Sequence, residues 1–132
     1  MPIPDRLTVA SADRRWQIRI TDDNSPTLVQ AATDDSMHSG CGAIAETRYV
    51  YLAGSGVAER LAAGVATRVL EVGFGSGMGW LLSADAALVQ GTALHYVGLE
   101  NQLPPEPVVR QLDLTRFLQR PDLLDAYLRW WA

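Results

Sequence analysis

The chain of 132 residues contains no lysine, a single cysteine and no long apolar run. Cys41 by itself cannot form an internal disulfide, and no cluster of ligand residues surrounds it at the spacing of a metal site, so we expect no metal. No segment approaches the roughly 18 uncharged apolar residues of a transmembrane helix. The first residues lack a basic segment followed by an apolar one, so no signal peptide is predicted. We therefore expect a cytoplasmic protein with no membrane partner.

The positive charges are few and all are arginine. Eleven arginines stand against fifteen acidic residues, for a net charge of −4, and 48% of the residues are hydrophobic. A protein that binds nucleic acid usually carries a basic stripe. Here one short cluster, Arg14, Arg15 and Arg19, is followed directly by Asp22 and Asp23. The composition indicates an ordinary globular domain and does not support a nucleic-acid partner.

The order of the expected elements points to an α/β protein. Alternating apolar residues predict a strand over 14–20, and turn residues at 22–26 return the chain into a second strand over 27–32, which makes a hairpin followed by a loop. For the remaining residues the patterns predict helix 43–52, a short helix that ends at Gly64, strand 67–73, helix 78–90 and strand 93–100. One or two further helices are predicted over 108–131, with Pro121 in the first turn of a helix. Both later strands are short and apolar, which predicts a buried parallel sheet. His95 is accordingly expected to be packed in the core.

We divide the chain accordingly into two parts of one structural unit. Residues 1–42 form the N-terminal hairpin and loop. Residues 43–132 form a partial Rossmann-like unit, in which a strand, a helix and a parallel strand are followed by C-terminal helices.

The most informative stretch is EVGFGSGMGW, Glu71 to Trp80, which has a glycine at every second position from Gly73. Glycines allow left-handed backbone and close approach of a ligand, whereas four of them would weaken a regular strand or helix. The dinucleotide fingerprint G-x-G-x-x-G does not fit, because its third glycine falls on Met78. The pattern acid-x-G-x-G-x-G does fit, and it is typical of class I S-adenosylmethionine (SAM) methyltransferases. A carboxylate at this position attracts the ammonium and sulfonium groups of SAM, whereas it would repel the phosphate of a nucleotide cofactor.

A second acidic residue ends the next strand. Glu100 closes HYVGLE, at the place where a carboxylate can accept hydrogen bonds from ribose hydroxyls. NAD-binding folds use the same device, so Glu100 alone does not separate the two cofactors, and the glycine spacing favours SAM. The alternative is a tight turn with Glu71 and Glu100 as ordinary surface acids.

Longer stretches resemble one particular family. AETRYVYL ahead of EVGFGSG, with LHYVGLEN following, is similar to the MnmD-like methyltransferases that act on the tRNA wobble uridine, which correspond to the N-terminal half of bifunctional MnmC proteins. The resemblance covers roughly residues 13–128. It implies SAM as cofactor and tRNA as substrate.

Carried over to this sequence, the family pattern implies a set of cofactor-binding residues. Around the methionine part of SAM it places Glu71, Gly73, Phe74, Gly75 and Gly77. Glu100 would hold the ribose, with Asn101 beside the adenine. Glu46 and Tyr49, on the helix before the loop, would close the pocket, although Glu46 could equally pair with an arginine and Tyr49 could equally be a packing residue.

The sequence also departs from the family. The family continues with further strands and an Asp-Gly-Phe-type motif that faces the target amine, and no such motif occurs here. We therefore expect a truncated form and assign no catalytic residue. Trp130 and Trp131 are expected to be uncovered, so the C-terminal helix is a candidate contact with a second copy. Three alternatives stay open: a methyltransferase, a non-catalytic remnant that binds SAM or a partner, and an NAD-dependent oxidoreductase fragment.

Overall fold

The computed structural model describes residues 5–132, and it begins with a small antiparallel sheet. Strands β1 (Thr8–Ala10), β2 (Trp16–Ile20) and β3 (Pro26–Gln30) pair in that order. Ile18 lies opposite Val9 on one side and Leu28 on the other. The predicted hairpin is therefore confirmed. Strand β1 was not predicted, because three residues carry too little pattern and its strand conformation comes from pairing with β2.

The helical segment that follows has two parts. Helix α1 (Ala43–Glu46) continues into a π-helical segment, η1 (Thr47–Ala53), and helix α2 (Val57–Ala62) comes after a break at Gly54–Gly56. The extent of the predicted helix 43–52 is confirmed, but its wider winding was not foreseen. The N–H of Gly54 donates to the carbonyl of Tyr49 at 3.0 Å, which is the five-residue spacing of a π turn.

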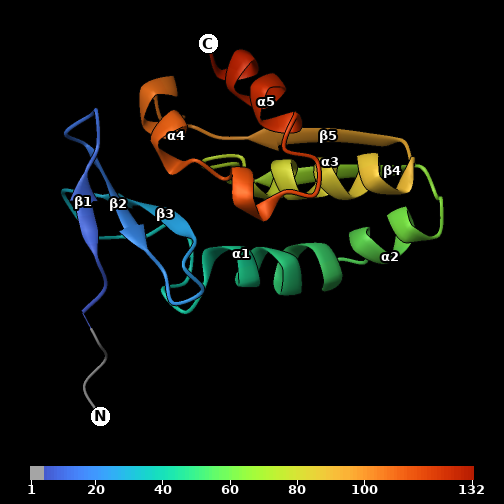
Figure 1. Cartoon of the computed structure of the whole chain (residues 1–132), viewed down its shortest axis with the longest axis horizontal. Coiled ribbons are helices and arrows are strands. Elements are labelled where there is room, and N and C mark those ends of the chain that lie inside the picture. The colour runs from blue at the N-terminus through green and yellow to red at the C-terminus, as the bar shows by residue number, and fades with distance from the viewer. Residues whose placement is uncertain (1–4) are drawn as a thin grey trace.

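The centre of the chain forms a parallel strand pair joined by a helix. Strand β4 (Thr67–Val72), helix α3 (Met78–Gln90) and strand β5 (Leu94–Leu99) occupy the predicted ranges. Figure 1 shows this unit at one end of the molecule and the antiparallel sheet at the other.

The prediction that these two strands are buried is wrong. Apart from the buried Thr67, the residues of β4 alternate between exposed and half-buried, as do those of β5 as far as Val97. Leu70 and Val72 are 66% and 80% exposed. His95, expected in the core, is also exposed. An apolar strand is buried only when other elements cover both faces of its sheet. In the part of the chain described, one face of the β4–β5 pair stays open.

The C-terminal region consists of α4 (Glu106–Leu112), a 3-10 turn η2 (Thr115–Phe117) and α5 (Leu123–Trp131). Asp113, in left-handed conformation, ends α4 and divides the predicted helical stretch. Pro121 does not lie in the first turn of α5 as predicted. It precedes the N-cap residue Asp122, because the helix begins two residues later. Trp130 is exposed as expected, whereas Trp131 is half-buried.

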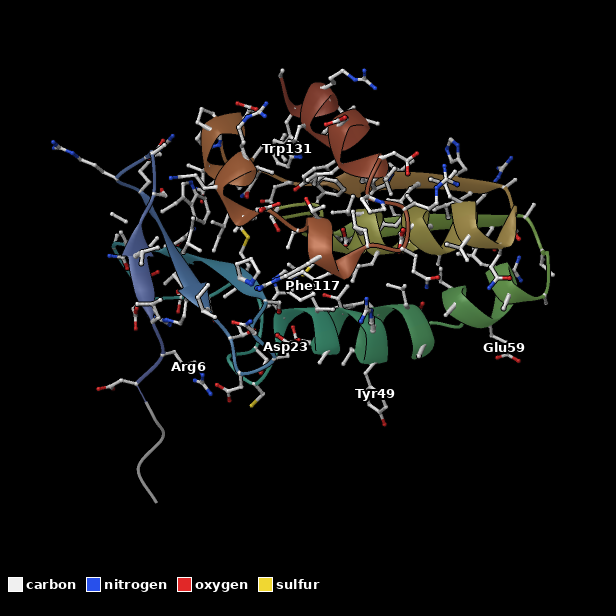
Figure 2. All side chains as sticks on the ribbon, in the orientation of Figure 1. Arg6, Asp23, Tyr49, Glu59, Phe117 and Trp131 are labelled. Carbon is white, nitrogen blue, oxygen red and sulfur yellow. The ribbon has the colours of Figure 1, made fainter. Side chains whose placement is uncertain are left out.

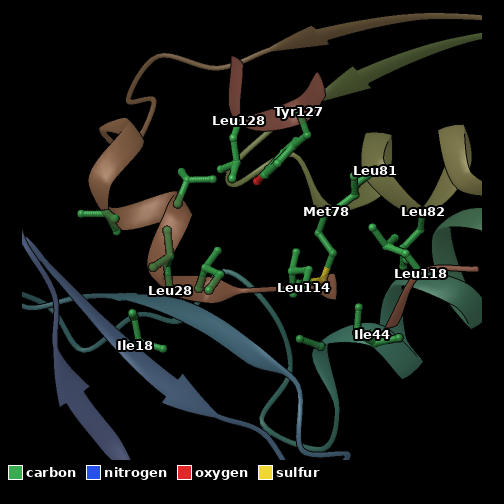
Figure 3. Close-up of a cluster of buried hydrophobic side chains, with 14 of the residues drawn as sticks. Ile18, Leu28, Ile44, Met78, Leu81, Leu82, Leu114, Leu118, Tyr127 and Leu128 are labelled. Carbon is green, nitrogen blue, oxygen red and sulfur yellow. The ribbon is translucent and has the colours of Figure 1, made fainter. Parts of the chain in front are cut away.

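One continuous hydrophobic core connects the N-terminal sheet to the later elements. Ile18 and Leu28 of the antiparallel sheet belong to the same cluster as Met78 and Leu81 of α3 and Tyr127 of α5 (Figure 3). The division into residues 1–42 and 43–132 stays a prediction, and the two parts share this core. It holds the loop between β4 and α3 in place against α5.

Candidate functional site

The loop between β4 and α3 is built on left-handed glycines. Gly73, Gly75 and Gly77 have φ values of +85°, +59° and +77°, which only glycine adopts without strain. The N–H groups of Gly73 and Phe74 both donate to the carbonyl of Leu99, at 2.8 and 3.0 Å. The alternate glycines therefore allow a tight backbone path that stays attached to the end of β5.

The side chain of Glu100 fastens the same loop. Its Oε2 accepts the N–H of Gly75 at 2.8 Å, and its Oε1 accepts the N–H groups of Asn101 and Gln102 at 3.0 and 3.1 Å. The acid predicted at the end of β5 thus lies beside the glycine loop. Each carboxylate oxygen has two lone pairs, so Oε1 is fully used and Oε2 keeps one lone pair that can accept a ligand donor.

Glu71 lies beneath the first turn of α3. A Cβ on Gly79 would come within 2.6 Å of Glu71 Oε2, so a glycine is needed there to make room for the carboxylate. Burial raises the pKa of Glu71, hydrogen bonding from Tyr96 opposes that rise, and the charge of Glu100 adds to it. Within residues 5–132, the buried Oε1 of Glu71 has no hydrogen-bond partner. Such an atom is costly unless something else supplies a donor.

Phe74 projects onto β5 and the C-terminal helix. A Cβ on Gly98 would meet Phe74 Cδ2 at 2.1 Å, so the ring lies directly on the backbone of β5. Its centroid is 6.5 Å from that of Tyr96, 5.7 Å from Trp130 and 6.4 Å from Trp131. The phenylalanine inside the glycine loop therefore connects the loop to α5.

A hollow of about 680 Å³ opens beside the loop. Six of the predicted cofactor residues line it: Glu71, Gly73, Phe74, Gly75, Glu100 and Asn101. Its other walls include Trp16, Met37, Thr47 and Tyr51, from the N-terminal sheet, the following loop and η1. The volume is within the usual range for small-molecule sites, about 300–1,000 Å³.

Three predicted residues lie elsewhere. Gly77 is buried behind the loop, where a Cβ would contact Phe74 and Tyr127. Glu46 accepts the N–H of Ser39 at 3.2 Å, which fixes the loop before α1. Tyr49 is 81% exposed and points away from the rest of the molecule (Figure 2), so the structure does not bring it to the hollow.

The same helical segment instead contributes Thr47 and Tyr51, which belong to the AETRYVYL stretch but were not among the predicted cofactor residues. The signal for them in the sequence is the helical spacing from Ile44 through Thr47 to Tyr51, which places these side chains on one side of the helix. Tyr96 was also missed. It stands two residues before Gly98 on the half-buried face of β5, and that face could be identified only once the neighbours of the strand were known.

Residues 5–132 contain no group of three or more His, Cys, Asp or Glu side chains placed to hold a metal ion. The described helices include none with the length and apolar character needed to cross a membrane.

Comparison with known proteins gives two curated relatives, both named tRNA 5-methylaminomethyl-2-thiouridine biosynthesis bifunctional protein MnmC. The protein from Burkholderia multivorans is 34% identical over 103 residues, which are 74% of this chain and 14% of the relative. The protein from Aromatoleum aromaticum is 29% identical over 117 residues, or 86% of this chain and 16% of the relative. The chain thus spans only a small part of the length of either protein. No family model matches the chain.

A solved structure shows the same fold. The crystal structure of MNMC2 from Aquifex aeolicus aligns with a TM-score of 0.53 and 23% identity, over 85% of this chain and 37% of that one. The overall arrangement of strands and helices is therefore shared. Together these similarities confirm the resemblance found in the sequence: the chain is similar to part of the MnmC proteins, which are named for tRNA modification, and it shares the fold of MNMC2.

Proposed function

We propose that the hollow beside the glycine loop binds SAM, and that the chain is a SAM-dependent methyltransferase-like protein. It would be related to the enzymes that methylate the aminomethyl group on the tRNA wobble uridine. The observation that carries the proposal is the buried Glu71 Oε1, which lacks a hydrogen-bond partner among the described residues and lies next to the glycine loop. An ammonium group in the hollow would give that oxygen a donor.

The residues present fit this cofactor in charge as well as in size. Two carboxylates, Glu71 and Glu100, line the hollow on the side of the loop. The charge of Glu100 helps to raise the pKa of Glu71, so it disfavours the ionised form of Glu71. A bound cation relieves this repulsion, whereas a pyrophosphate would increase it. This difference favours SAM over the dinucleotide alternative.

Each residue then has a definite part in binding. Glu71 would hold the ammonium of the methionine moiety, and Glu100 would accept a hydrogen bond from a ribose hydroxyl with the remaining lone pair of Oε2. Asn101 would lie beside the adenine. Gly73 and Gly75, which have no side chain, would allow the cofactor to approach the loop backbone closely.

When bound, SAM supplies an electrophilic methyl group on its sulfonium. The contribution of the chain is to position this group and to exclude water, and an amine that attacks it must be neutral. The acceptor, by family resemblance, would be a tRNA base that carries an aminomethyl group. The proposal assigns no catalytic side chain.

The test is calorimetric titration of the purified chain with SAM, with NADH titrated in parallel. Glu71→Gln keeps the shape of the side chain and removes its charge, so we expect SAM affinity to fall by about tenfold or more, as for the loss of a charge-assisted hydrogen bond. Glu59→Gln is the matched control, because Glu59 lies on α2 and points away from the molecule (Figure 2). It should bind SAM like the unmodified chain.

The outcomes separate the alternatives. Absence of SAM binding by the folded chain, or equal affinity in Glu71→Gln, would overturn the proposed site. Tighter binding of NADH would favour the oxidoreductase alternative. If SAM binds, a transfer assay with tRNA containing the aminomethyl-modified uridine follows. Methyl incorporation would establish the activity, and binding without transfer would reduce the proposal to a non-catalytic SAM-binding protein.

A further inference from the structure

A second hollow, of about 290 Å³, adjoins the Phe74 ring and is walled mainly by aromatic side chains. Nothing in the SAM proposal requires it. Its lining consists of Phe74, Trp80, Tyr96, Gly98, Glu100, Leu103 and Trp130. These residues come from the glycine loop, α3, β5, the segment after β5 and α5. The hollow therefore exists only in the folded chain.

The aromatic rings meet at steep angles. The planes of Phe74 and Tyr96 are inclined at 68°, and those of Phe74 and Trp130 at 60°. Rings in this arrangement form the adjoining walls of a corner and leave faces or edges directed into it. Trp80 is held by stacking on Tyr127, with centroids 5.9 Å apart and planes inclined at 15°.

The packing keeps this corner in place. The Phe74 ring lies on Gly98, where no side chain competes with it. Trp130 is 63% exposed, so its side of the hollow faces solvent. The arrangement thus has a fixed inner wall and an accessible mouth.

The formal charge on the wall of this hollow is negative. Glu100 is the charged residue that the described chain places on its wall. The face of an aromatic ring also carries a partial negative charge, and several such faces around one carboxylate attract a cation. A metal ion would lack the ligands it needs, because carbon atoms form most of the surface. An organic cation, with alkyl groups around its charge, matches both the apolar rings and the carboxylate.

We propose that this corner is a binding site for a small alkylammonium cation, recognised by the faces of Phe74, Tyr96 and Trp130 and by the charge of Glu100. The inference goes beyond the proposed cofactor site. The two hollows share Phe74, Tyr96 and Glu100, whereas Trp80 and Trp130 line the second one alone. Changes at Trp130 therefore test the cation site without altering the residues assigned to SAM.

The test uses choline and its uncharged carbon analogue, neohexyl alcohol, which has nearly the same shape. Titration is followed by proton NMR of the ligand, since methyl protons that lie over aromatic rings shift upfield. We expect choline to bind with this shift and the alcohol to bind about tenfold or more weakly, because only the cation gains from the ring faces and the carboxylate. Equal affinity for both ligands, or no binding of choline, would overturn the proposal.

Variants of Trp130 distinguish a cation site from an apolar one. Trp130→Phe keeps a ring face and should retain most of the preference for choline. Trp130→Leu keeps apolar volume without the ring, so the preference for choline over the alcohol should fall several-fold. Tyr49→Ala is the control, since it removes an aromatic ring that is 81% exposed elsewhere on the surface. An unchanged preference in Trp130→Leu would contradict the assignment, and SAM titration of the same variant should give the affinity of the unmodified chain.

Discussion

The backbone N–H of Gly75 donates a hydrogen bond of 2.8 Å to the carboxylate of Glu100, which connects the loop after β4 to the end of β5. The side chain of Glu100 thus links the ends of the two parallel strands. Because the same carboxylate also accepts two N–H groups from the residues that follow it, Glu100 organises both turns at this end of the sheet.

Replacement of Glu100 by glutamine should destabilise the fold. An amide has one acceptor oxygen, and its NH2 group cannot accept the backbone donors that the second carboxylate oxygen now accepts. We expect the free energy of unfolding to fall by about 1–3 kcal/mol, measured by urea denaturation. Glu106→Gln is a suitable control, because Glu106 pairs with Arg110 along α4 near the surface and its loss should cost no more than about 0.5 kcal/mol. Equal effects of the two changes would contradict this role of Glu100.

A side chain at position 98 should displace Phe74. The Cβ of Gly98→Ala would lie 2.1 Å from Phe74 Cδ2, far inside contact distance. The strand residue has no left-handed conformation to lose, so the expected cost of about 1–3 kcal/mol comes from the ring alone. It should therefore nearly vanish when Gly98→Ala is made in a Phe74→Ala background. Thermal or urea unfolding of the four proteins in this cycle measures the coupling, and additive effects would show that the ring does not lie on Gly98.

The free energy of unfolding should depend on pH through Glu71. Burial raises the pKa of this carboxyl in the folded chain above its ordinary value of 4.5. In the range between the two pKa values, the folded state binds more protons than the unfolded state, so stability falls as the pH rises from 4.5 through the folded value. Glu71→Gln, which cannot ionise, should lack this fall.

The measurement is a series of urea denaturations over that pH range, taken as the difference between the unmodified chain and Glu71→Gln. Carboxyls such as Asp13, whose ion pair with Arg15 lowers its pKa to about 2, affect both proteins alike and cancel in the difference. A flat difference curve for Glu71→Gln would show that its carboxyl is not held in a desolvated position.

The open face of the β4–β5 pair should behave as an exposed apolar patch. Leu70 pairs across the strands with Val97, and Val72 pairs with Leu99. All four side chains are at least 42% exposed. The double change Leu70→Thr/Val72→Thr keeps good strand formers and should alter the free energy of unfolding by no more than about 0.5 kcal/mol.

The same double change should lower the binding of a dye that fluoresces on apolar surfaces. Leu7→Thr removes an exposed apolar side chain outside the patch and should have little effect on dye fluorescence. A large loss of stability in the double variant would instead mean that the face is covered in solution, and sedimentation of the unmodified chain would then show whether a second copy covers it.

Part of the site followed directly from the sequence. The spacing of Gly73, Gly75 and Gly77 could be interpreted because only glycine tolerates left-handed backbone at such positions, and an acid at a strand end is a local feature in the same way. The hairpin and the range of α3 followed from periodicity, which depends on each segment alone. These features need no knowledge of the neighbours of a segment.

Features that depend on neighbours could not be derived in this way. An apolar strand has the same sequence whether its face is covered or open, so the exposure of Leu70 and Val72 was mispredicted. Tyr49 lies in the middle of a helical segment, and its position in the sequence does not say which side of that segment faces the core. The packing of α1 and η1 against the core leaves its side chain exposed to solvent.

The sequence by itself determined the hairpin, the strand–helix–strand unit, the left-handed loop and the acids at its two sides, because short-range sterics and charge encode them. Only the tertiary structure decided that Phe74 lies on Gly98, that Glu100 binds Gly75 and that Trp130 joins an aromatic corner. Such contacts join residues that are distant along the chain. They form where helices and strands pack, and the packing is set by the whole core at once.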